Sequence, residues 1–139
     1  MLARSLMVGS AAILLALGTL HLVYTFWGPA LRPRDPAVQA LMSQTHLVLT
    51  RQTTMWRAWI GFNASHSMGA MLFGLVYGYL ALLHVELLFR SPFLLIVGGV
   101  MLVGIVVLAK LYWFSVPFWS TCVALACFVS SIVLRPASI

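Results

Sequence analysis

The chain has 139 residues, of which 63% are hydrophobic and only ten carry a charged side chain. A soluble domain of this size needs a more polar surface, so this composition excludes a soluble globular protein. The formal charge of +6 comes without a basic run of the kind that binds nucleic acid. We therefore expect a single transmembrane domain over residues 1–139, surrounded by the lipid bilayer and without a nucleic-acid partner.

Four apolar runs are each long enough to cross a bilayer, which takes about 20 residues. The first covers about residues 5–26 and is longer than the apolar core of a cleaved signal peptide, so we interpret it as an uncleaved span. The other three cover about residues 55–83, 92–109 and 116–134. The runs are continuous rather than alternating, which favours helices over a β-barrel. The predicted fold is an all-α, polytopic, antiparallel four-helix transmembrane bundle.

An additional helix is predicted between the first two spans. The polar stretch GPALRPRDP contains three prolines, which interrupt the first helix. Asp35-Pro36 is a typical helix start, because Asp caps a helix N-terminus and Pro is favoured at the first helical position. Apolar and polar residues then recur at helical spacing, which predicts an amphipathic helix over about residues 36–52. This helix lies on the membrane interface or extends the second span.

Small residues recur four apart in the second span, at Ala70, Gly74 and Gly78. Helices in lipid associate through the close packing of such residues, so we expect this row to face a neighbouring helix.

The distribution of Lys and Arg predicts the orientation of the spans. One side of the membrane receives three cations, and the side that holds the loop after the first span receives five. By the positive-inside rule this loop is cytoplasmic and both termini lie outside.

A group of polar side chains near the start of the second span is the main functional clue. Asn63 and His66 are three residues apart and share a helix face. Ionisable residues in membrane helices are costly and usually face the protein interior. The end of the first span and the third loop are expected on the same side of the membrane. We therefore predict a one-sided polar pocket formed by His21, Tyr24, Trp56, Arg57, Trp59, Asn63, His66 and Tyr112.

Three functions fit this pocket. It could bind a lipid-like molecule with a polar or anionic head, and whether it also catalyses a reaction stays open. His21 and His66 could instead ligate haem b between neighbouring helices, as in a b-type cytochrome. The chain could also be an accessory subunit that packs against a larger membrane complex or against a second copy of itself. No metal-binding motif stands in the sequence.

Simpler structural roles account for the same residues. Arg57 can extend to the headgroups, and the Trp and Tyr side chains can form an interfacial belt. Asn63 and His66 can hold helices together by hydrogen bonds. The carboxylates Asp35 and Glu86 are expected on opposite sides of the membrane, which argues against a carboxylate-based hydrolase or proton transporter.

The runs HLVYTFWGPALRPRD and TTMWRAWIGFNASHSMGAMLFGLVYGYL resemble those of small bacterial integral membrane proteins with four predicted spans. The resemblance covers residues 18–82, over half of the chain. It implies a multi-pass protein of the bacterial inner membrane, and it implies no activity and no catalytic residue.

Overall fold

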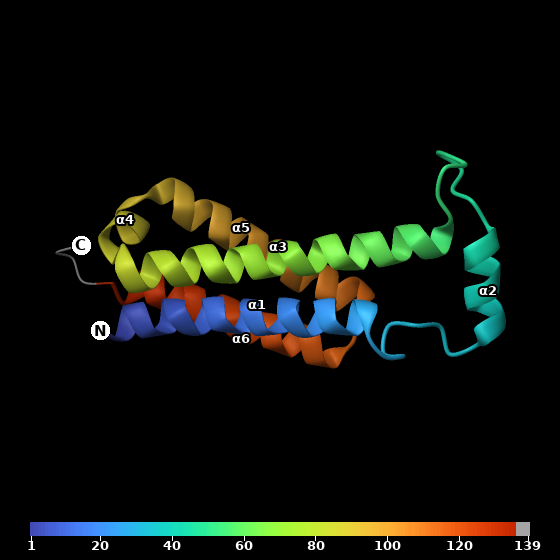
Figure 1. The fold of residues 1–139 in the computed structure, drawn as a ribbon. Helices are drawn as coiled ribbons and strands as arrows, with labels where there is room; N and C mark the ends of the chain where they lie inside the picture. Colours follow the sequence, from blue (N-terminus) through green and yellow to red (C-terminus); the bar gives the residue numbers. More distant parts are fainter. Residues whose placement is uncertain (136–139) are drawn as a thin grey trace. The chain divides into compact units, whose positions relative to one another are not determined.

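The structure, a computed structural model, describes residues 1–135. Over these residues it contains six helices and no strand (Figure 1). The helices are α1 (Leu2–Phe26), α2 (Pro36–Gln44), α3 (Met55–Leu83), α4 (Val85–Arg90), α5 (Pro92–Tyr112) and α6 (Ser115–Val133). Four of them, α1, α3, α5 and α6, are long and apolar enough to cross a membrane. The predicted all-α fold with four candidate spans is confirmed, and it fits a multi-pass membrane protein.

Capping residues explain where two of the helices begin. The Asp35 carboxylate accepts a hydrogen bond from the Ala37 N–H at 2.8 Å, and Pro36 is the first residue of α2, as predicted. The Ser91 hydroxyl accepts from the Leu94 N–H at 3.3 Å at the start of α5. Each cap satisfies a backbone donor that the first turn leaves without a helical partner.

The amphipathic helix is shorter than predicted, because α2 ends at Gln44 and not at residue 52. Thr45 has an extended backbone, and its hydroxyl donates to the Leu41 carbonyl at 2.8 Å, which ends the helix. The run THLVLT that follows is rich in β-branched residues, which disfavour helix. Residues 45–54 instead form a tight loop that leads into α3.

A short helix, α4, stands between the second and third spans and was not predicted. It begins after His84, whose backbone (φ −135°, ψ 47°) is not helical. The chain therefore makes a separate helical turn here rather than a direct connection from α3 to α5.

Residue contacts divide the chain into two compact units. The first comprises Met1–Leu17 and Ala70–Ile139, and the second comprises Gly18–Gly69. Both α1 and α3 contribute one part to each unit. The single domain expected from the sequence stays a prediction.

The first unit contains a buried core to which all four candidate spans contribute. At its centre the Phe73 and Tyr77 rings stack at 4.3 Å, and Phe128 from α6 contacts both. The Tyr77 hydroxyl donates to the Leu94 carbonyl at 2.6 Å. Gly98 makes room for these rings, since a Cβ there would come within 2.7 Å of the Tyr77 ring.

The small residues of α3 face α1, as predicted. A Cβ built on Gly74 would lie 2.6 Å from the Leu15 Cβ and 2.7 Å from the Ala11 carbonyl oxygen. A Cβ on Gly78 would meet Ala11 at an ordinary 3.7 Å. The backbones of α1 and α3 therefore approach most closely at Gly74, which is the role of small residues in membrane helix pairs.

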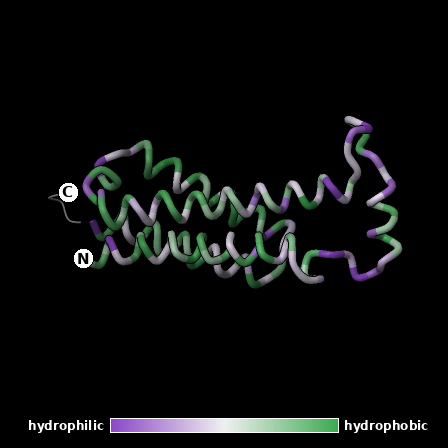
Figure 2. Tube along the Cα trace, in the orientation of Figure 1, coloured by the Kyte–Doolittle hydropathy of each residue, from purple (hydrophilic) through white to green (hydrophobic). Residues whose placement is uncertain are grey.

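The exposed side of α5 is as apolar as the core. It presents Ile96, Val100, Val103 and Val107 to the surroundings at helical spacing, and hydrophobic residues cover most of the helix (Figure 2). In water such a stripe would be unfavourable, whereas lipid tails accept it without cost. The exterior of the first unit therefore suits a bilayer.

Candidate functional site

The second unit carries the polar residues of interest at the end of α1 and the start of α3. At about 1.5 Å per residue, the 29 residues of α3 extend about 44 Å, longer than the roughly 30 Å hydrocarbon layer. The apolar end of the helix at Leu83 suits the layer, so the excess falls on the segment that starts at Met55. The side chains between Met55 and Asn63 are thereby expected at the level of lipid headgroups.

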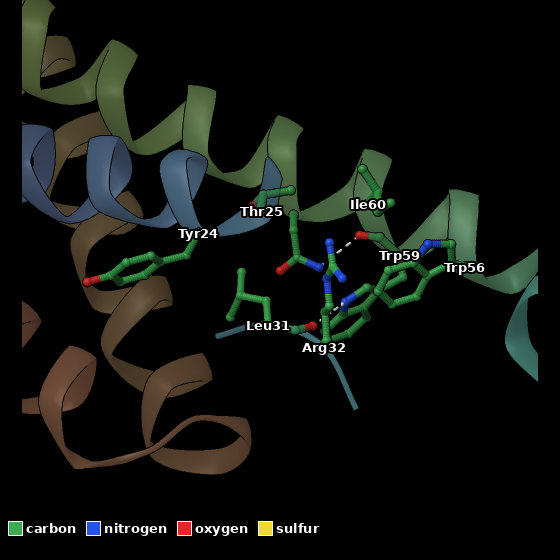
Figure 3. A pocket seen from close by; sticks show the side chains of 8 residues that line it. Tyr24, Thr25, Leu31, Arg32, Trp56, Trp59 and Ile60 are labelled. Atoms are coloured by element: carbon green, nitrogen blue, oxygen red, sulfur yellow. Dashed lines mark hydrogen bonds between the residues drawn. The ribbon is translucent and has the colours of Figure 1, made fainter. Parts of the chain in front are cut away.

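A small recess lies in the second unit (Figure 3). The volume within which the centre of a water molecule can move is about 10 Å³. A volume of this size holds about one water molecule. Three segments line it, namely the end of α1, the loop before α2 and the first half of α3. The lining residues are Tyr24, Thr25, Leu31, Arg32, Trp56, Trp59, Ile60 and Asn63.

The loop is attached to α3 by a hydrogen bond from the Trp59 indole N–H to the Leu31 carbonyl, at 3.1 Å. The loop reaches this position through Gly28, whose φ of +86° only glycine adopts readily. A turn follows, in which the Arg32 N–H donates to the Pro29 carbonyl at 3.0 Å. These contacts place the side chain of Arg32 among the lining residues (Figure 3).

Asn63 connects α1 and α3 within the second unit. Its side-chain NH₂ donates to the Trp59 carbonyl at 2.8 Å, which directs its oxygen toward the His21 Nε2 at 3.0 Å. Because an amide oxygen only accepts, His21 carries its proton on Nε2 and donates it. Asn63 is only 7% exposed, so these hydrogen bonds satisfy a polar group that would otherwise be costly to bury.

His66 lies beside His21 rather than in the recess. The two rings meet edge to face with their centroids 5.5 Å apart, and the Phe62 ring stacks parallel to His66 at 6.4 Å. This arrangement does not fit haem, because rings in edge contact leave no gap for a flat macrocycle. The Nε2 that would ligate iron in His21 is bonded to Asn63.

The structure places the predicted site residues in three groups. Tyr24, Trp56, Trp59 and Asn63 line the recess. His21 and His66 do not line it, but His21 is hydrogen-bonded to Asn63 and His66 contacts the His21 ring. Arg57 is exposed on the first turn of α3 and does not line the recess. Tyr112 is the last residue of α5, is exposed and belongs to the first unit.

Four lining residues were not predicted from the sequence, and Arg32 is the most important of them because it carries a charge. Trp56, Ile60 and Asn63 stand at i, i+4 and i+7, so they share one helix face. This spacing identifies the face and excludes Arg57, which is turned about 100° away from Trp56. The other three unpredicted residues are uncharged side chains that line the recess, namely Thr25, Leu31 and Ile60.

The chemistry of the recess favours anions. Its only charged lining residue is the Arg32 guanidinium, which binds phosphate or carboxylate oxygens in a forked geometry. The second unit contains four arginines and one acid, Asp35, whose carboxylate caps α2. Within residues 1–135, no group of three or more His, Cys, Asp or Glu side chains could hold a metal ion. The recess therefore offers one guanidinium group that an anion could contact.

No protein family, curated protein or solved structure matches this chain. The four spans that the sequence resemblance implied are present as candidate spans, while the bacterial source and the inner membrane stay predictions.

Proposed function

We propose that this chain is an integral membrane protein that binds the anionic head of a lipid-like molecule at the recess around Arg32. The observation that carries the proposal is the placement of Arg32 by the Trp59–Leu31 hydrogen bond, next to a hollow with room for one water. A single oxygen of a phosphate, sulfate or carboxylate group fits the same space. The remainder of the head would lie over the mouth of the recess, between the two indoles.

The surroundings suit the rest of such a molecule. The second unit exposes apolar side chains on its two long helices, among them Val23 on α1 and Phe62 on α3. A ligand tail in the bilayer can lie against these residues while its head stays at the Trp level, where amphipathic groups accumulate. A soluble anion would gain nothing from this apolar flank, so an amphiphile fits better.

The test compares two arginines of the same loop. Protein purified in mild detergent is extracted, and the retained amphiphiles are identified by mass spectrometry for the parent, Arg32→Gln and Arg34→Gln. Both arginines are exposed, but Arg34 does not line the recess, which makes it the matched control. A hydrogen bond to a charged group contributes about 1.5–3 kcal/mol, so Arg32→Gln should lower retention about tenfold or more.

The parent and Arg34→Gln should retain the same anionic amphiphile. Equal retention by all three proteins would reject Arg32 as the binding residue. An absorption spectrum of the parent, His21→Ala and His66→Ala tests the haem hypothesis. A Soret band in the parent that is absent from both variants would show that the two histidines bind haem. The chain would then be a cytochrome and the amphiphile proposal would be wrong.

A further inference from the structure

Hydrogen bonds join the two ends of the loop of residues 45–54, which lies between α2 and α3. The Met55 N–H donates to the Thr45 carbonyl at 2.9 Å, and His46 and Thr54 form an antiparallel bridge. The His46 Nδ1 also donates to the Thr53 carbonyl at 2.9 Å. These bonds hold the two ends of the loop together, so its tip is presented as a preformed hairpin.

The tip of this hairpin is apolar. The Thr50 N–H donates to the Leu47 carbonyl at 3.3 Å, which closes a turn with Val48 and Leu49 at its centre. Val48 is 109% exposed and Leu49 is 92% exposed. The centre of a turn normally carries Gly, Pro, Asn or Asp, because these residues fit its backbone or bond to it. Aliphatic residues here break a local rule without any gain in packing, which points to a role outside the folded chain.

The charge around the tip is positive. Arg51 is exposed two residues after Leu49, and no acidic residue occurs between Asp35 and Glu86. Exposed aliphatic side chains beside a cation suit the boundary between headgroups and acyl chains of an anionic membrane, because the apolar groups can leave water there while the arginine stays among anionic headgroups. A protein partner fits less well, because a stable interface needs about 800 Å² from each side, far more than two side chains offer.

We propose that Val48 and Leu49 insert into the surface of a membrane that contains anionic phospholipid, with Arg51 on the headgroups. The loop is then a second membrane contact, separate from the spans and independent of the recess at Arg32. It fixes the start of α3, since the hairpin ends at Thr54, whose hydroxyl accepts from the Arg57 N–H at 3.4 Å.

The test places an environment-sensitive fluorophore on a single cysteine in the full-length protein, with Cys122 and Cys127 changed to alanine. Val48→Cys reports on the tip, and Ser43→Cys, an exposed polar position on α2, is the matched control. Both proteins are reconstituted into vesicles of phosphatidylcholine alone or of phosphatidylcholine with an equal amount of phosphatidylglycerol. Emission wavelength, iodide quenching and quenching by spin-labelled lipid are measured.

The probe at residue 48 should show blue-shifted emission, protection from iodide and quenching by spin-labelled lipid, all stronger with phosphatidylglycerol. Arg51→Gln should remove the dependence on phosphatidylglycerol, and Arg34→Gln should leave it. The proposal is overturned if the probes at residues 48 and 43 behave alike in both vesicles. It is also overturned if the shift depends on protein density without lipid quenching, which would assign the tip to a second copy of the chain.

Discussion

Replacing Gly74 by alanine should lower the thermal stability of the protein in detergent more than the same replacement at any other glycine of α3. The new Cβ would lie 2.6 Å from the Leu15 Cβ, and it would also meet two backbone atoms of α1, the Ala11 oxygen at 2.7 Å and the Leu15 nitrogen at 2.8 Å. Backbone atoms cannot rotate away, so the helices must separate. Overpacking of this kind costs about 1–3 kcal/mol.

Two glycines provide controls for this experiment. A Cβ on Gly78 makes an ordinary 3.7 Å contact, and a Cβ on Gly104 of α5 meets nothing within 4 Å. Alanine is favoured over glycine inside a helix by about 1 kcal/mol, so Gly104→Ala should be neutral or slightly stabilising. If Gly74→Ala melts at the same temperature as Gly104→Ala, the close contact between α1 and α3 does not exist in the protein.

Asn63→Leu should destabilise the protein although it makes a membrane helix more apolar. The substitution removes the acceptor for the His21 Nε2 proton and leaves that donor without its 3.0 Å partner. Side-chain hydrogen bonds between membrane helices contribute about 1–2 kcal/mol at most, so a loss of that size is expected in the free energy of unfolding. Ser65→Ala is the matched control, because the Ser65 hydroxyl donates only to the Phe62 carbonyl of its own helix.

A double-mutant cycle isolates the cause. If the cost comes from the unpaired histidine, adding His21→Leu to Asn63→Leu should recover part of the stability, and the two substitutions should not be additive. Strictly additive effects would mean that Asn63 stabilises α3 alone, through the Trp59 carbonyl.

Much of the fold follows from local features of the sequence. Continuous apolar runs locate the four candidate spans, and the pair Asp35-Pro36 locates the start of α2. The end of α2 was less predictable, because an amphipathic pattern continued beyond Gln44 while the backbone turned into a hairpin. The spacing of apolar residues carries no information on the hydrogen bonds within the loop, and these bonds decide where α2 ends.

The site was predicted only in part. Arg57 was predicted to line it, whereas Arg32 is the arginine that does. Asn63 and His66 are predicted site residues because they share a face of α3, and of the two only Asn63 lines the recess. Arg57 is predicted with them because the start of α3 is expected on the membrane side where the other polar groups gather, yet its position around the helix axis keeps it out of the recess. Arg32 enters through a contact between residues 31 and 59, and such long-range contacts leave no local signal.

Photo-crosslinking tests the anion-binding recess most directly. An alkyl phosphate with a diazirine next to the phosphate is added to the full-length protein, irradiated and mapped by peptide mass spectrometry. The structure predicts crosslinks on residues 24–32 and 56–63, sharply reduced in Arg32→Gln and unchanged in Arg34→Gln. Crosslinks spread along lipid-facing residues such as Val100 of α5, with no effect of Arg32→Gln, would contradict the account.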